Sequence, residues 1–137
     1  MLGACAGLFR SQPPSAELMA AMAPFGGGMG SSGQVCGTLA GALAVIGFTM
    51  GKTGPEERDH RKMWKLSNTM VRRFADICRP YGGINCAQIA GVDWKNPAAV
   101  KAFYRDPDSR RRNCVQVIRE TSLALHALVT EHLDRNG

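Results

Sequence analysis

Aromatic residues and strand-like patterns are scarce in this chain of 137 residues, whereas alanine, glycine and methionine are abundant. Phe, Trp and Tyr together make up 7% of the residues, and no run alternates between apolar and polar side chains. This scarcity disfavours a β-sandwich, which is built from β-branched and aromatic residues. Apolar residues account for 45% and charged residues for 20%, as in ordinary globular proteins. The composition therefore favours packed helices in one domain spanning residues 1–137.

Several motifs for catalysis and cofactor binding are also missing. The chain has no C-x-x-C pair, which removes the signatures of thioredoxin-like proteins, zinc ribbons, ferredoxins and c-type haem attachment. It also lacks G-x-S-x-G, H-E-x-x-H and a complete phosphate-binding loop, so no hydrolytic site is indicated. Haem is therefore not an expected cofactor.

No charged residue lies between Glu17 and Lys52. Residues 33–50 of this stretch are apolar all round, which predicts a buried central helix. Small residues recur along it every four positions, at Gly33, Gly37 and Gly41. Such a stripe lets another helix approach closely. A membrane span is disfavoured, because the helical part has only about 16 residues and a span needs about 20. The predicted fold is an all-α, single-domain helical bundle around this buried, glycine-rich central helix.

Apolar positions spaced three and four residues apart predict further helices. They are expected at residues 1–11, 15–24, 55–78, 86–90, 98–104 and 107–133. Pro55 would open the third of these, and Asp106 would cap the last with Pro107 in its first turn. Five of the nine residues from 25 to 33 are glycine, which predicts a loop whose backbone passes close to a neighbouring group.

Five cysteines in a chain without a recognisable export signal do not indicate a disulfide scaffold. The first ten residues hold one late arginine and no sustained apolar stretch, so we expect a cytoplasmic protein. In a reducing compartment, cysteines are buried small hydrophobes, metal ligands or redox-active thiols.

The expected positions of the cysteines help to separate these roles. Cys36 is expected in the first turn of the central helix, Cys86 directly after the cap residue Asn85, and Cys114 early in the last helix. Helix N-termini and nearby cations stabilise the thiolate, which is both the nucleophile and the metal ligand. Cys78 is instead expected at a helix C-terminus, where the dipole disfavours a thiolate, and we interpret it as structural.

The glycine block and its cysteine carry a family resemblance. Residues 25–30, Phe-Gly-Gly-Gly-Met-Gly, followed by residues 34–41, Gln-Val-Cys-Gly-Thr-Leu-Ala-Gly, closely resemble the family of redox-active proteins named for its cysteine pattern, C_GCAxxG_C_C. The same module resembles the domain that accompanies the haem region in split-Soret cytochromes. Three other cysteines match the family's pattern by their order, namely Cys5, Cys86 and Cys114.

The resemblance implies a redox role in which four cysteines act together. In the split-Soret relatives the corresponding domain is associated with an iron–sulfur centre. A cluster of the [2Fe–2S] type is therefore implied, for electron transfer or redox sensing, and soft thiolate ligands suit it. Its implied metal ligands are Cys5, Cys36, Cys86 and Cys114. Its implied cofactor-binding backbone is that of Gly26, Gly27, Gly28 and Gly37.

Three other functions stay open at this stage. Cys36 and Cys86 are the candidate catalytic residues for direct thiol–disulfide chemistry without a metal. The same four cysteines are an accepted ligand set for structural zinc. Alternatively, the chain is a non-catalytic basic binding module, in which the run from Arg110 to Arg112 meets phosphate or an acidic partner.

The net charge of +6 bears on the choice of partner. We expect a redox partner protein with an acidic surface, and a homodimer is left open. The absence of aromatic residues interleaved with the basic run disfavours nucleic acid. Membrane association is not expected.

Overall fold

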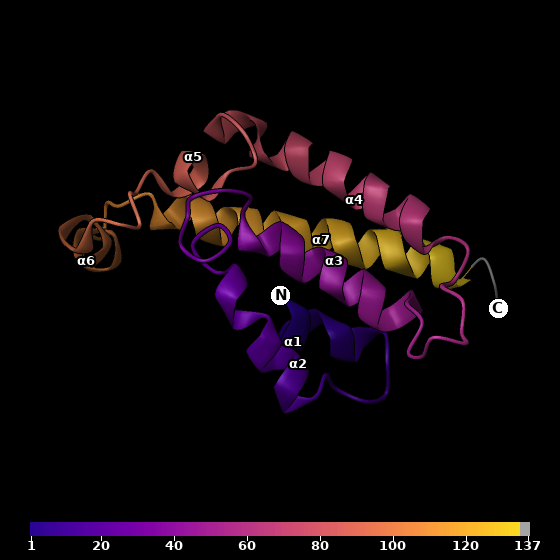
Figure 1. Ribbon diagram of the computed structural model, residues 1–137. Helices are drawn as coiled ribbons and strands as arrows, with labels where there is room; N and C mark the ends of the chain where they lie inside the picture. The colour runs from indigo at the N-terminus through magenta and orange to yellow at the C-terminus, as the bar shows by residue number, and fades with distance from the viewer. Residues whose placement is uncertain (135–137) are drawn as a thin grey trace.

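The computed structural model describes residues 1–134 as a bundle of helices (Figure 1). The last residues of the predicted domain, 135–137, lie outside the described part. Seven α-helices are present in residues 1–134, and the only β-type pairing there is one antiparallel bridge between Val35 and Asn85. The predicted all-α fold is therefore confirmed.

Three helices form the body of the bundle: α3 (Gly37–Met50), α4 (Met63–Cys78) and α7 (Arg111–Asp134). Each packs along the other two (Figure 1). Their shared core contains large side chains that are almost fully buried, including Ile46, Leu66, Met70, Phe74, Val117 and Leu125. Each such side chain contributes about 1.5–3 kcal/mol through burial. In α4 the buried residues Leu66, Met70 and Phe74 are four positions apart, which agrees with the helical spacing of its apolar residues.

Helix α3 is covered on a further side by the start of the chain. Helix α1 (Leu2–Cys5) packs against α3, and a β-carbon added at Gly41 would lie 2.7 Å from Cβ of Met1. The small side at Gly41 therefore admits another segment at close range, as predicted. With Leu39, Ala42, Val45 and Ile46 also buried, α3 is the expected buried central helix.

The N-terminal helices are shorter than predicted. The helix expected over residues 1–11 consists of α1 followed by a 3-10 turn, Ala6–Leu8. The helix expected over residues 15–24 is α2 (Ala16–Ala21), followed by a 3-10 turn at Ala23–Phe25. Ser15 caps α2, since its hydroxyl accepts the N–H of Leu18 at 3.2 Å.

The prediction that a helix begins at Pro55 is wrong, because α4 starts only at Met63. Residues 51–62 form a loop in which acidic side chains bind backbone amides. Asp59 accepts the N–H of Lys52 at 3.0 Å, and Glu57 accepts the N–H of Thr53 at 2.8 Å. These carboxylates therefore close a loop and do not stabilise the first turn of a helix that begins at Pro55.

The last helix also begins later in the chain than predicted. Helix α7 begins at Arg111, and Asp106 is the C-cap of α6 (Pro97–Arg105). The Asp106 carboxylate accepts the N–H of Asp108 at 2.8 Å, which stabilises a turn rather than a helix start. Helix α6 stands away from the main bundle at one end of the molecule (Figure 1).

Helix α5 (Cys86–Ala90) begins where both the side chain and the backbone of Asn85 are engaged. The Asn85 side chain accepts an N–H of the first turn, and Oε1 of Gln88 accepts the N–H of Asn85 at 3.1 Å. This capping box fixes the residue before Cys86. Asn113 links α7 to α5, because its side-chain amide donates a hydrogen bond to the backbone carbonyl of Ile89 at 3.2 Å.

Candidate functional site

Cys36 and Cys86 are brought together by a short antiparallel pairing between residues 34–36 and 84–86. The N–H of Cys36 donates to the carbonyl of Ile84 at 3.0 Å, and the N–H of Cys86 donates to the carbonyl of Gln34 at 2.7 Å. Side chains alternate across such a pairing, so both cysteines leave it on the same face. As diagonal neighbours their backbones lie about 7–8 Å apart, with the β-carbons closer.

The glycine loop packs directly on this pairing. Gly28 has φ +77°, and a β-carbon there would lie 2.5 Å from the carbonyl oxygen of Gln34 and 2.7 Å from Cβ of Cys86. At Gly37 a β-carbon would collide with the carbonyl of Phe25. The loop folds back on itself, since Gly33 and Gln34 donate their N–H groups to the carbonyls of Gly27 and Gly28. Gly28 is therefore needed as glycine, because backbone and a cysteine occupy the space of a side chain.

Cys36 itself is the N-cap of α3, not a first-turn residue as predicted. Its carbonyl accepts the N–H of Leu39 at 3.0 Å. The cysteine side chain is half-buried, whereas Cys86 is 7% exposed. Of the two, Cys36 is thus the more accessible to a substrate.

Two more sulfurs lie within electrostatic reach of Cys36. Burial raises the pKa values of Cys78, Cys86 and Cys114, and a negative charge on Cys36 raises them further. Cys114 packs against both the main core and a smaller one formed by Cys86, Ala90, Val92 and Phe103. Cys36, Cys86 and Cys114 therefore lie near one another at one end of the bundle, together with Cys78.

The position of Cys78 beside this group was not predicted. The signal was available, because only a 3-10 turn, Arg79–Tyr81, and a few residues separate Cys78 from the strand-like pairing at Cys86. Burial raises the pKa of Cys78 to about 12, with smaller contributions from the charges of Cys36 and Glu120. The thiol thus stays protonated at neutral pH, which fits a structural role.

Cys5 lies further along the bundle. Its thiol contacts Sδ of Met1 at 3.6 Å, and the hydroxyl of Ser122 contacts the same sulfur at 3.5 Å. Ser122 follows Cys114 on α7 by eight residues, which corresponds to about 12 Å along a helix. The structure therefore places Cys5 at another level of the bundle, and its part in a shared site stays a prediction.

Burial dominates the ionisation of the two remaining thiols. It raises the pKa of Cys114 from its ordinary 9.0 to about 11, with the charges of Cys86 and Cys36 adding to the effect and Arg111 opposing it. Burial likewise raises the pKa of Cys86. The expectation that helix starts and cations hold these two cysteines as thiolates is therefore wrong, because desolvation outweighs both.

Trp94 covers Cys86 from the side of the smaller core. Its indole opposes the effect of burial and lowers the pKa of Cys86, but its N–H forms no hydrogen bond with any residue from 1 to 134. This buried donor has no partner in residues 1–134. The ring is held edge-on to Phe103, with ring centres 5.3 Å apart. A buried donor without a partner costs about 1–3 kcal/mol, and a charged acceptor within its reach would offset that cost.

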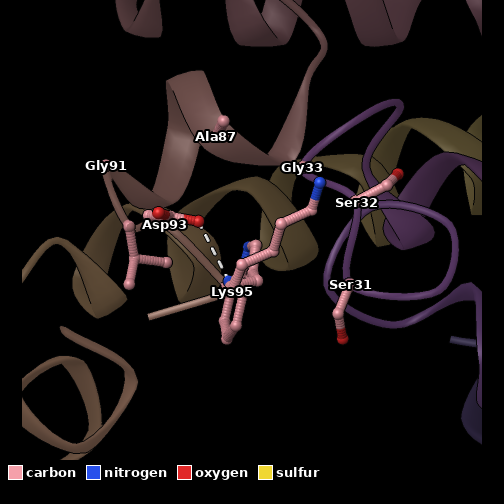
Figure 2. A pocket seen from close by; sticks show the side chains of 9 residues that line it. Ser31, Ser32, Gly33, Ala87, Gly91, Asp93 and Lys95 are labelled. Carbon is pink, nitrogen blue, oxygen red and sulfur yellow. Dashed lines mark hydrogen bonds between the residues drawn. The ribbon is translucent and has the colours of Figure 1, made fainter. Parts of the chain in front are cut away.

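A cavity of about 380 Å³ lies beside the pairing (Figure 2). It is lined by the glycine-loop residues 31–33, by Ala87 and by residues 91–95, including Trp94. The Lys95 side chain extends toward Gly33, while its backbone N–H donates to Asp93 at 2.9 Å (Figure 2). Ala87 directly follows Cys86 on α5, so the cavity lies beside the helix that begins at this cysteine.

Within the described chain, no three Cys, His, Asp or Glu side chains are placed to hold one metal ion. The gathered sulfurs are thus near one another without converging on a single point. The predicted four-cysteine set for a [2Fe–2S] cluster or for zinc is not assembled in this arrangement, and both remain predictions. In the same residues, no helix has the length and apolar character needed to cross a membrane.

The family model described as "Putative redox-active protein (C_GCAxxG_C_C)" matches residues 1–128. The chain belongs to the C_GCAxxG_C_C family. The match includes every cysteine and the glycine loop, so the C_GCAxxG_C_C resemblance is confirmed and a redox role is supported. Neither the curated proteins nor the solved structures contain a significant match.

Proposed function

We propose that this member of the C_GCAxxG_C_C family is a thiol–disulfide redox protein in which Cys36 and Cys86 cycle between two thiols and one disulfide. The observation that carries the proposal is the hydrogen-bonded pairing of residues 34–36 with 84–86, which sets both side chains on one face. A disulfide needs β-carbons about 3.8 Å apart. Closing the diagonal pair therefore requires a shift of a few ångströms at the edge of the glycine loop.

The proposed reaction balances as two exchanges. The thiolate of Cys36, the more accessible sulfur, attacks a substrate disulfide R–S–S–R, and one R–S⁻ leaves and takes up a proton. Cys86 then loses its proton and attacks the Cys36 sulfur of the mixed disulfide, so that the second R–S⁻ leaves. The substrate gains two electrons and two protons, and the protein becomes the Cys36–Cys86 disulfide.

The surroundings of Cys86 support a role as the second nucleophile. Burial keeps this thiol protonated, so it does not compete with Cys36 for the incoming disulfide. Against the effect of burial, the Trp94 indole lowers the pKa of Cys86, and its N–H has no hydrogen-bond partner in residues 1–134. We expect the cycle to run in the cytoplasm, where reductants restore the dithiol.

The test uses the purified reduced protein and its single-cysteine variants. Oxidation by a small disulfide should lower the mass by two hydrogens, and peptide mapping should locate the bond between Cys36 and Cys86. Cys36→Ser should form no mixed disulfide, and Cys86→Ser should stop at a stable one. Cys78→Ser should behave as the unmodified protein. A disulfide between any other pair, or none in the unmodified protein, contradicts the proposal.

The iron–sulfur centre is the second candidate, because Cys114 packs beside Cys86 and adds a third sulfur to the pair. When bound, such a cluster would supply one-electron chemistry. Anaerobically purified protein should then contain iron and sulfide and absorb visible light. That absorption should be lost in Cys36→Ser or Cys86→Ser and kept in Cys78→Ser. Zinc in elemental analysis would instead indicate a structural site.

A further inference from the structure

A basic groove lies where α6 meets α7. It measures about 390 Å³, and its walls include Tyr104, Arg105, Arg111, Arg112 and Val115. The segment from residue 95 to residue 112 contains six Lys and Arg residues but only two acidic ones. Much of the chain's positive charge is therefore concentrated at this end of the molecule.

The groove's guanidinium groups are available for a ligand. None of Arg105, Arg111 and Arg112 forms an ion pair with any side chain that the structure describes. Arg111 lies over the ring of Tyr104, 5.6 Å from its centre. The acid on the groove wall, Asp106, already accepts the N–H of Asp108.

Apolar surface accompanies the charge. Tyr104 is 57% exposed and Val115 is 60% exposed, although both lie in helices. Phe103 holds Tyr104 edge-on, with ring centres 5.2 Å apart. An exposed tyrosine with an arginine over its ring is typical of protein interfaces, in which Tyr and Arg are the enriched anchors. One aromatic ring without further rings along a basic track is a poor platform for nucleic acid.

The groove is close to the cysteine pair. Val115 follows Cys114 on α7, and the Cys114 side chain turns inward to pack with Phe103 and Cys86. Phe103 and Tyr104 are neighbours on α6, so one face of this helix covers Cys86 and the other borders the groove. A protein bound in the groove would therefore sit over the layer that covers the redox site.

We propose that this groove docks an acidic segment of the protein that exchanges disulfides with Cys36 and Cys86. The inference rests on the proposed thiol chemistry for its purpose, whereas the docking itself depends only on the groove. Carboxylates of the partner would pair with Arg111 and Arg112, and an apolar side chain among them would pack on Tyr104 and Val115. Such charge pairing also steers the encounter.

The test measures binding of a labelled oligoglutamate peptide. The double variant Arg111→Glu/Arg112→Glu should weaken binding by about tenfold or more at low salt, because two favourable charges are reversed. The matched control is Arg58→Glu/Arg61→Glu, which reverses the same charge in the exposed loop before α4. Its affinity should change by less than about twofold, and added salt should abolish the difference.

A kinetic arm separates docking from chemistry. Two disulfide-linked peptides, one rich in glutamate and one neutral, serve as substrates. The Arg111/Arg112 variant should slow reduction of the acidic substrate only. Failure to reduce either substrate overturns the thiol function and leaves docking to be judged by affinity. Equal losses in both double variants, or tighter binding of a thymidine oligonucleotide than of oligoglutamate, overturn the docking proposal.

Discussion

Replacing Gly28 with alanine tests the close approach of the glycine loop to Cys86. Gly30 provides a matched control, because both residues have positive φ, +77° and +67°, but a β-carbon at Gly30 would have nothing within 4 Å. Gly30→Ala should therefore lower the free energy of unfolding only by the cost of a left-handed alanine, about 1–2 kcal/mol. Any further loss in Gly28→Ala reports on its neighbours.

The steric cost of a methyl group at Gly28 follows from its two nearest contacts. A β-carbon at Gly28 would stand 2.5 Å from the Gln34 oxygen and 2.7 Å from Cβ of Cys86. Neither atom is the free end of a flexible side chain, so backbone must move by about 1 Å to reach ordinary contact. Overpacking of this kind costs about 1–3 kcal/mol. Gly28→Ala should thus lose about 2–5 kcal/mol in total.

Urea denaturation followed by far-ultraviolet circular dichroism measures both variants. The difference between their free energies of unfolding should be at least about 1 kcal/mol. The displacement of Cys86 should also slow formation of the Cys36–Cys86 disulfide in Gly28→Ala and leave it unchanged in Gly30→Ala. Equal stabilities, within about 0.5 kcal/mol, would refute the close approach.

Three further measurements probe other parts of the bundle. Thr121 is fully buried and its hydroxyl has no partner in the described residues, so Thr121→Val should raise the free energy of unfolding by about 1–2 kcal/mol; a comparable fall would contradict this. The pKa of Cys78 rises from 9.0 to about 12 on folding, so the unfolded chain ionises first and stability should fall as pH rises from about 9 toward 12. Urea titrations above pH 9 should show that the free energy of unfolding falls less steeply with pH in Cys78→Ala than in the unmodified protein. An equal slope would exclude ionisation of Cys78 as the cause of the fall. Asn85→Ala removes a cap of α5, should cost about 1 kcal/mol, and should speed alkylation of Cys86; unchanged alkylation would show that the cap does not position that thiol.

Sequence patterns predicted the elements whose position depends on burial. The uncharged stretch gave α3 correctly because a helix without a polar face has to lie at the centre of the bundle. The core positions of α4 followed from their spacing for the same reason. On α7, Val117 is fully buried, whereas the adjacent Ile118 is 45% exposed. Helical spacing alone does not decide which of two adjacent apolar residues faces the core.

Helix starts and thiol ionisation were predicted less well. Glu57 and Asp59 have the composition of a first helical turn, yet carboxylates bind loop amides equally well, and local sequence does not distinguish the two. The ionisation of Cys114 depends on how deeply α6 and α5 bury it, which is a tertiary property. The gathering of Cys36 and Cys86 was expected from family resemblance, but the bridge that achieves it has no signature in either segment.

The bridge between Val35 and Asn85 also bears on how the protein is made. Cys36 and Cys86 are fifty residues apart, so bringing them together costs about 3–4 kcal/mol of loop-closure entropy that local contacts do not offset. On the ribosome, α3 and α4 emerge before the segment that carries Cys86. The cysteine pair is therefore incomplete until the segment with Cys86 has been made, and an oxidised pair would report that the two segments have met.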